Sequence, residues 1–232
     1  MKRAVNNLLA VIFALALPVS VWAGDMEEGQ KYYDANDYAK ARPLLMRAAA
    51  QGSSRAQVTL GMMYFNGQGV PQDYKQAASR YRKAAALGDA KGAFNLGVLY
   101  VNGQGVTRDY AQAASWFRKA AEKSDAKAQV NLGLLYTNGQ GVARDYLEAA
   151  SWYRKAAEAG DSRAQFNLGV LYANGYGVPH DDVESQKWFN VAAANGYEPA
   201  KRNRDVVTKN LSSEQVAEAE RRSASWLSAH SH

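Results

Sequence analysis

The chain of 232 residues contains no cysteine. Disulfides therefore cannot stabilise its fold, and it has neither a cysteine nucleophile nor a cysteine for a lipoprotein anchor. Histidine is scarce: only His180, His230 and His232 are present. His180 is expected in a solvated loop with no partner to orient it as a general base, and the other two at a frayed end where they could hold a metal only weakly. We therefore expect no catalytic residue, no metal site and no cofactor.

A strong charge of one sign is also missing. The formal net charge is +6, and it falls by two, to +4, when Lys2 and Arg3 are left out. The remaining basic residues are spread along the chain and form no dense tract. This distribution argues against nucleic acid as a partner.

The apolar run near the N-terminus is short. It covers ten residues, Leu8–Leu17, after Lys2 and Arg3 and before Val21-Trp22-Ala23. This order is typical of a secretory signal peptide, here cleaved after Ala23. A retained membrane anchor is the alternative, but ten residues are too few to cross a bilayer comfortably. We predict a signal peptide over residues 1–23, export to the periplasm of a Gram-negative bacterium or secretion, and no stable membrane insertion.

What the chain does contain is one stretch that occurs four times. A glycine recurs every 36 residues, and a tyrosine, an asparagine and an aspartate recur in register with it: Gly61, Gly97, Gly133 and Gly169; Tyr64, Tyr100, Tyr136 and Tyr172; Asn66, Asn102, Asn138 and Asn174; Asp73, Asp109, Asp145 and Asp181. A fixed period between 20 and 50 residues is the signature of a solenoid.

Each unit reads as two short helices. In residues 54–89, small and apolar residues at helical spacing lead to Tyr64, and Asn66-Gly67 ends that helix. Asp73, with Gln76 three residues later, resembles a capping box at the start of a second helix. The Gly-x-Gly pairs between the helices follow no strand, so they are turn glycines and form no nucleotide-binding loop. Helices this short need packing against their neighbours.

Both ends of the array depart from the repeat. The residues from Asp25 to Gln51 predict an N-terminal hairpin whose second helix should be kinked by Pro43. The fourth unit differs at four positions, which suggests that its outer side meets something other than a standard unit: Asp182, Ser185, Gln186 and Val191. Ser212 and Gln215 predict a capping box that opens a last helix. The expected organisation is a signal peptide (1–23), a capping hairpin (24–53), four repeats (54–197) and a helical cap (198–232).

The motif Leu-Gly-x-x-Tyr-x-Asn-Gly-x-Gly-Val, then Asp-Tyr, then Ala-Ala-x-Trp-aromatic-Arg-Lys-Ala-Ala, runs from Leu96 to Ala121 and from Leu132 to Ala157. It resembles the Sel1-like repeat, a relative of the tetratricopeptide repeat, and the resemblance covers residues 54–197. The hairpin over 24–53 is similar to an ordinary tetratricopeptide unit. The resemblance implies an all-α fold, a right-handed α-solenoid of stacked helix-turn-helix repeats.

The resemblance also implies where a partner binds, because tetratricopeptide relatives line their concave surface with first-helix positions. We transfer these positions to this sequence by counting from Gly61 and its repeats, and we call each set of equivalent positions a lane. One lane is cationic and two are apolar: Arg55, Lys91, Lys127 and Arg163; Val58, Phe94, Val130 and Phe166; Met62, Val98, Leu134 and Val170. Partial burial and ordinary surface charge are the alternative. However, a cation near a helix N-terminus is unfavourable because it opposes the helix dipole. Four such cations at equivalent positions therefore suggest a function in binding. We expect a non-enzymatic scaffold or adaptor that binds a partner protein or an extended peptide with acidic flanks.

Three further interpretations stay open. Trp116, Trp152 and Trp188 could bind rings, although packing between second helices is the simpler account. The basic row on the second helices could be a solvated face or could meet anionic lipid or glycan: Arg82-Lys83, Arg118-Lys119 and Arg154-Lys155. Cysteine-rich relatives of the same family imply a penicillin-binding or β-lactamase-type enzyme, but their cysteines are missing here.

Overall fold

The computed structural model describes residues 19–230. Residues 1–18 of the predicted signal peptide lie outside this range, so the signal peptide stays a prediction. The described residues form twelve α-helices and no strand. The helices are α1 (Val19–Asp34), α2 (Tyr38–Ala50), α3 (Ser54–Asn66), α4 (Tyr74–Ala86), α5 (Ala90–Asn102), α6 (Tyr110–Ala121), α7 (Ala126–Asn138), α8 (Tyr146–Glu158), α9 (Ser162–Asn174), α10 (Asp182–Ala194), α11 (Pro199–Thr208) and α12 (Ser213–Ala229).

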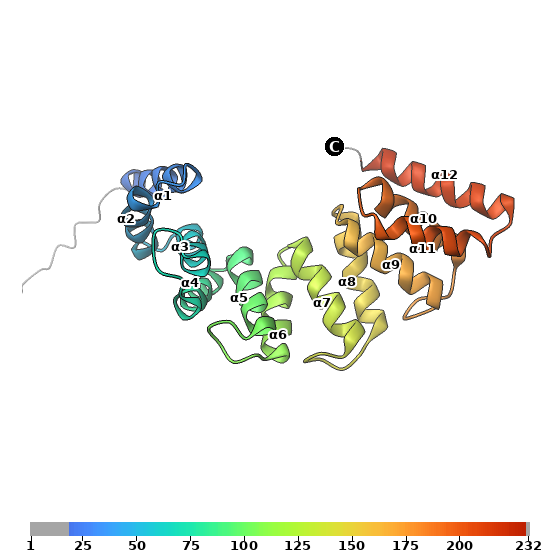
Figure 1. Cartoon of the computed structure of the whole chain (residues 1–232), viewed down its shortest axis with the longest axis horizontal. Coiled ribbons are helices and arrows are strands. Elements are labelled where there is room, and N and C mark those ends of the chain that lie inside the picture. Colours follow the sequence, from blue (N-terminus) through green and yellow to red (C-terminus); the bar gives the residue numbers. More distant parts are fainter. Residues whose placement is uncertain (1–18, 231–232) are drawn as a thin grey trace, which may run out of the picture.

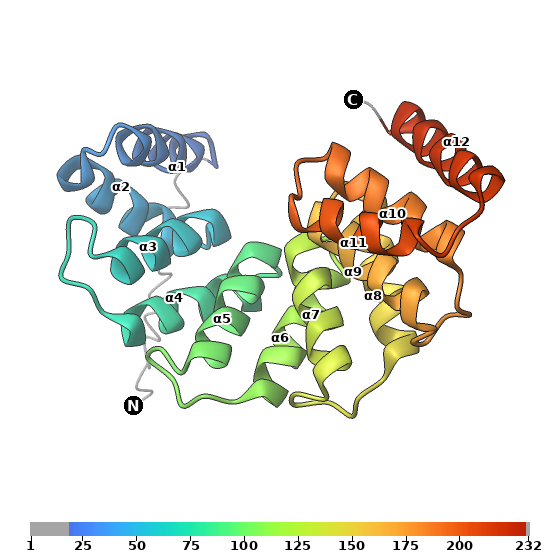
Figure 2. The same cartoon turned by 45° about the vertical axis from the view of Figure 1, so that its right-hand side comes forward.

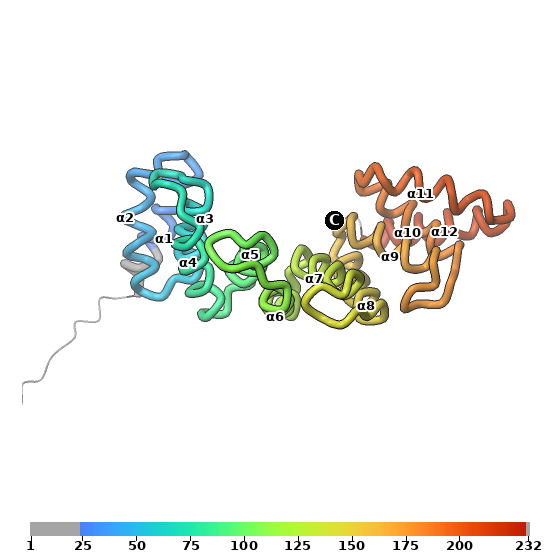
Figure 3. The backbone as a smooth tube through the Cα atoms, turned by 60° about the horizontal axis from the view of Figure 1, so that its bottom comes forward, coloured from blue at the N-terminus to red at the C-terminus, as the bar shows by residue number. Residues whose placement is uncertain are grey.

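The helices stack in pairs along an arc. From α3 to α10, each first helix packs against the second helix of its own pair and against the second helix of the pair before it. Figures 1 and 2 show the resulting curve, with α1 at one end and α12 at the other. The tube in Figure 3 shows the same succession without the ribbons. The predicted all-α, right-handed α-solenoid is confirmed. Within residues 19–230, no helix is both long and apolar enough to cross a bilayer.

An aspartate caps the second helix of every repeat, as the sequence predicts. The Asp109 carboxylate, for example, accepts hydrogen bonds from the backbone N–H groups of Ala111 and Gln112, at 2.9 and 3.0 Å. The return contact of a capping box does not form there, because the Asp109 N–H already donates to the Tyr100 carbonyl at 3.0 Å. The box predicted at Ser212 and Gln215 does form and begins α12.

The second glycine of each hairpin loop lies against the preceding repeat. Gly105 has φ +69°, and a Cβ there would be 2.2 Å from the backbone of Tyr74, the first residue of α4. Gly141 with Tyr110 and Gly177 with Tyr146 repeat this backbone contact, whereas a Cβ on Gly69 would lie 2.4 Å from the Cβ of Tyr38. These glycines therefore close the turn and also dock it on the previous unit. The fourth unit has Asp182 in place of this tyrosine, and no such loop follows it.

The core is a row of aromatic rings set against helical glycines. Phe117 is 1% exposed, and a Cβ on Gly97 would lie 2.7 Å from its ring. The same arrangement occurs in the other repeats, in the pairs Tyr81 with Gly61, Tyr153 with Gly133, and Phe189 with Gly169. The first and second helices of a repeat can approach closely only because the glycine leaves room for the ring. In the N-terminal pair, α2 continues through Pro43.

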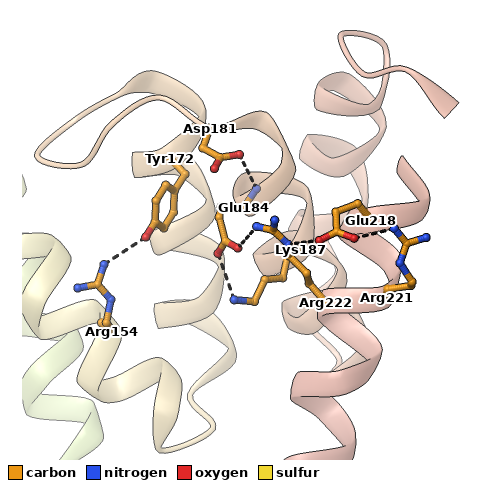
Figure 4. Close-up of polar contacts among 8 residues, drawn as sticks. All are labelled: Arg154, Tyr172, Asp181, Glu184, Lys187, Glu218, Arg221 and Arg222. Carbon is orange, nitrogen blue, oxygen red and sulfur yellow. Dashed lines mark hydrogen bonds and ion pairs between the residues drawn. The ribbon is translucent and has the colours of Figure 1, made fainter. Parts of the chain in front are cut away.

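The C-terminal helix explains the irregular fourth repeat. Helix α12 packs on α10 instead of forming a hairpin with α11. Val191 of α10 is fully buried, with Trp226 and Leu227 of α12 packed against its cluster, whereas the other repeats have an exposed lysine at this position. An ion pair of 2.8 Å between Arg222 and Glu184 joins the two helices (Figure 4). The outer side of the fourth repeat therefore faces this helix.

Candidate functional site

A hollow of about 660 Å³ lies on the first-helix side of the N-terminal half. Side chains from α1, α3 and α5 and from the start of α7 line it. It brings together six of the twelve residues predicted to contact a partner: Arg55, Val58, Met62, Lys91, Phe94 and Lys127. We refer to this hollow as the N-terminal groove.

The three cations of the N-terminal groove are exposed and unpaired. Arg55, Lys91 and Lys127 are each the second residue of a helix, and no ion pair within the described part of the chain includes them. Two carboxylates line the groove as well, but each caps a helix: Asp89 accepts from the Gly92 N–H at 3.0 Å, and Asp125 from the Ala128 N–H at 2.8 Å. Because these carboxylates bind helix N-termini, the three cations are the charges left to meet a ligand.

The apolar wall of the groove is anchored in the core. Phe94 is partly buried, and its ring centroid lies 5.7 Å from that of Phe117 at an interplanar angle of 38°. Val58 is 5% exposed, and Met62 is partly buried. A ligand would therefore meet a wall that packing holds in place, with Phe94 offering the largest apolar side chain on it.

The other six predicted residues lie outside this groove. Val130 is 1% exposed and belongs to the core, while Phe166 packs between Phe189 and Tyr197 at centroid distances of 5.6 and 5.2 Å. The remaining four are Val98 and Val170, both partly buried, Leu134, which is 37% exposed, and Arg163, which pairs with Asp161 at 3.6 Å. A binding role for these residues stays a prediction.

Sequence reasoning missed several lining residues. Gln30 of α1 accepts a hydrogen bond from the Thr59 hydroxyl at 3.1 Å, and both residues line the groove. Gln30 follows Gly29 as Met62 follows Gly61, so extending the third lane into the first hairpin would have found it. Asn95 follows Phe94 directly, but the three chosen lanes did not include its position.

The tryptophans and the basic row contact each other. Trp152 and Trp188 are 9% and 5% exposed, which agrees with packing rather than with a ring-binding ladder. The ammonium groups of Lys119 and Lys155 lie 4.1 and 4.2 Å from the ring centroids of Trp116 and Trp152. These are cation–π distances, so Lys119 and Lys155 are already engaged within the chain, whereas the first repeat has Arg80 in place of the tryptophan beside Lys83.

His180 lies exposed in a hairpin loop, as predicted, but the expectation that it has no partner was wrong. His180 has a partner, since its Nε2 lies 3.3 Å from a carboxylate oxygen of Asp182. The imidazole is exposed in a hairpin loop, where such a pair contributes little. Among residues 19–230, no group of three or more histidine, aspartate or glutamate side chains is arranged to hold a metal ion.

Comparisons with known proteins agree with this geometry. The family model described as Sel1 repeat matches residues 54–89, 90–125, 126–161 and 162–197. No curated protein matches the chain. Among solved structures, a protective antigen of uropathogenic Escherichia coli that displays an SLR fold is 32% identical, with a TM-score of 0.80 over 89% of this chain. The chain spans only 46% of that antigen.

Two other solved structures are similar. A Sel1 repeat protein from Oxalobacter formigenes is 34% identical with a TM-score of 0.77, and the match covers 86% of this chain and 84% of that protein. A putative sel1 repeat protein from Klebsiella pneumoniae is 25% identical with a TM-score of 0.51, over 81% of this chain and 93% of that one. With four matched repeats across residues 54–197 and these structural relatives, the chain belongs to the Sel1 repeat family.

Proposed function

We propose that this protein is an exported, non-enzymatic scaffold that binds a partner protein or an extended peptide in its N-terminal groove. Sel1 repeats mediate protein–protein interaction, and the repeat fold is typically a scaffold without catalytic activity. The observation that carries the proposal is the groove itself, in which Phe94 and Met62 form an apolar wall beside three unpaired cations. Export is supported by the signal-peptide pattern of residues 1–23.

The chemistry of the groove defines the partner. An apolar side chain packs on Phe94, and acidic groups on either side of it face Arg55, Lys91 and Lys127. Exposed cations act mainly on the association rate and its salt dependence, whereas a buried aromatic contact determines how long the complex lasts. The two kinds of residue therefore have separable effects.

The test starts with cross-linking and pull-down from an envelope fraction, which supplies a partner for affinity measurements at low and high salt. Phe94→Ala should weaken binding by about 2 kcal/mol or more, as truncation of a hot-spot aromatic does. Lys91→Ala should cost about 0–1 kcal/mol, mostly through slower association. Because Phe94 also contacts Phe117, thermal unfolding must show that the variant is folded.

The chain supplies matched controls for both effects. Phe166→Ala alters the same lane outside the groove, and Arg163→Glu reverses a cation that is already paired. Neither should change affinity as much as Phe94→Ala or the triple reversal of Arg55, Lys91 and Lys127. If the triple reversal and Phe94→Ala both leave binding at low salt unchanged, the proposed groove is not the binding site. No described residue favours the enzymatic alternative, which nitrocefin turnover by the purified protein would test.

A further inference from the structure

Three equivalent hollows lie between the C-terminal ends of consecutive second helices: between α4 and α6, between α6 and α8, and between α8 and α10. The third, which we call the α8–α10 hollow, has a volume of about 500 Å³, within the range of small-molecule sites. None of the residues that line it is buried, so a ligand can reach their side chains. It shares no lining residue with the N-terminal groove.

The α8–α10 hollow differs from the other two in charge. Lysines line both of the others: Lys119 and Lys123 the α4–α6 hollow, and Lys155 the α6–α8 hollow. In the fourth repeat, Val191 and Asn195 occupy the positions of Lys119 and Lys123, and no lysine or arginine lines the α8–α10 hollow. Its one carboxylate, Glu158, therefore has no cation beside it among the lining residues.

The charge of Glu158 is not neutralised within the described part of the chain. Glu158 is exposed, and it takes part in no ion pair among residues 19–230. Lys155, one turn earlier on α8, instead has its ammonium group 4.2 Å from the ring centroid of Trp152. A cation that enters the hollow can pair with this carboxylate without displacing an internal partner.

The indole of Trp226 lacks the cation that the tryptophans of the repeats have. Lysine ammonium groups lie 4.1, 4.2 and 4.6 Å from the ring centroids of Trp116, Trp152 and Trp188. Trp226 lines the α8–α10 hollow and is partly exposed, but no lysine or arginine of the described residues lies over its ring. An ammonium group in the hollow would therefore give Trp226 the same cation–π contact.

The side chains around Glu158 add hydrogen-bond acceptors. Asn195 donates its amide Nδ2 to Gln165 at 2.9 Å, which leaves its Oδ1 as an acceptor. The Nδ1 of His230 lies 2.8 Å from the carbonyl oxygen of Trp226. Because a carbonyl only accepts, Nδ1 carries the proton, and Nε2 of the neutral ring is an acceptor. A primary ammonium group, with three N–H donors, fits such surroundings.

We propose that the α8–α10 hollow binds a primary alkylammonium group. The ammonium group pairs with the Glu158 carboxylate and lies against the Trp226 ring, while the alkyl chain packs on Leu227. A small free amine and a lysine side chain of another protein both carry this group, so the test includes both. The site does not rest on the N-terminal groove, and either can fail without the other.

The test titrates the ¹⁵N-labelled full chain at pH 8 and constant ionic strength with n-butylammonium and, in parallel, with 1-butanol, which has the same alkyl chain without the charge. The reporter is the indole N–H resonance of Trp226. Butylammonium should shift this resonance saturably and bind about fivefold or more tightly than butanol, the ratio expected for one partly solvated ion pair. A capped tripeptide with a central lysine is titrated as well. If it binds more tightly than butylammonium, the site takes a lysine side chain; if it binds more weakly, the site takes a free amine.

Matched variants make the test specific. Glu158→Gln should weaken butylammonium binding about fivefold and leave butanol binding unchanged. Glu122→Gln is the control, because Glu122 is the corresponding residue of the second repeat and lines the two hollows that contain lysines; it should change neither affinity. Asn195→Lys places a lysine at the position of Lys123 and should also remove binding, which keeps the test decisive if Glu158→Gln alters the fold. Equal affinity for amine and alcohol overturns the proposal, as does a butylammonium affinity that Glu158→Gln leaves unchanged, or the absence of a saturable shift.

Discussion

Arg154 on α8 donates a hydrogen bond of 3.2 Å to the hydroxyl of Tyr172 on α9 (Figure 4). The same bond joins Arg118 to Tyr136, and Arg82 to Tyr100 at 3.4 Å. In each case the second helix of one repeat is connected to the first helix of the next. The basic row that sequence reasoning left open as a surface for anionic ligands is therefore part of the contact between repeats.

Removing one of these hydroxyls should have a small, measurable effect. We expect Tyr172→Phe to lower the free energy of unfolding in urea by about 0.5–1.5 kcal/mol, the net contribution of an ordinary hydrogen bond. Tyr64→Phe is the matched control, because the position that corresponds to the arginine holds Met46 and Tyr64 has no such bond. Equal losses in the two variants would mean that the arginine contact contributes nothing to stability.

The docking of hairpin loops on the preceding repeat can be separated from backbone strain. Gly141 and Gly160 both have positive φ, +70° and +86°, but a Cβ on Gly141 would be 2.1 Å from the Tyr110 backbone, and one on Gly160 would meet nothing within 4 Å. Gly160→Ala should cost about 1–2 kcal/mol from conformation alone. Gly141→Ala should cost clearly more in the same urea titration. Similar costs would show that the loop moves aside freely.

Because of Tyr153, the free energy of unfolding should decrease at alkaline pH. Burial raises the pKa of its phenol to about 12 from an ordinary value of 10.0, although a hydrogen bond with Thr137 lowers it. The unfolded chain therefore loses this proton near pH 10 and the folded chain only near pH 12, so stability is intact below pH 10 and falls as pH rises toward 12. The two-unit difference corresponds to about 3 kcal/mol.

Urea titrations at pH 9, 10 and 11 should reveal this loss, and Tyr153→Phe should reduce the pH dependence. Burial raises the pKa of Tyr81 too, so part of the dependence should remain in that variant. An identical slope in Tyr153→Phe and the parent chain would contradict the assignment.

The periodic features of the fold could be predicted from the sequence because the same residues recur in each of the four repeats. The step of 36 and the N-cap aspartates are local patterns that four copies confirm. The contact of Gly141 with Tyr110 could not be predicted, since both residues read as ordinary turn and helix residues until the repeats are stacked. The missing return contact of the capping boxes has the same origin: the N–H of Asp109 is bound by a carbonyl from the first helix.

The candidate site was harder to predict because a lane of equivalent positions need not have equivalent surroundings. Phe94 lines the N-terminal groove, whereas Phe166 packs against Tyr197, which has no aromatic counterpart at the equivalent position 125. The repeated glutamine differs in the same way: the Gln165 oxygen accepts a hydrogen bond of 2.9 Å from Asn195, whereas Gln129 has Ala159 at that position and its oxygen has no partner. Such differences arise from contacts between residues of different repeats, and the 36-residue period does not reveal those contacts.

The last prediction concerns the contact of α12 with α10. Val191→Lys restores the residue of the other repeats, but at a position that α12 covers completely. A buried, unpaired ammonium costs several kcal/mol, so α12 should detach and let the lysine reach water. Hydrogen exchange should then show lost protection over 213–229, while α4–α8 keep theirs because repeats contact only their neighbours.

The reverse change gives the control for that prediction. Lys155→Val alters the corresponding exposed residue of α8, where no helix lies above it, and removes only its contact with Trp152 at 4.2 Å. It should change stability by about 0.5–1 kcal/mol, the size of an exposed cation–π contact, and leave α12 protected. Since the Arg222–Glu184 ion pair also joins α12 to α10, Arg222→Ala should weaken the protection of α12 less than Val191→Lys does. If Val191→Lys leaves exchange over 213–229 unchanged, Val191 is not what holds α12 in place, and the ion pairs around Glu184 would have to carry the contact.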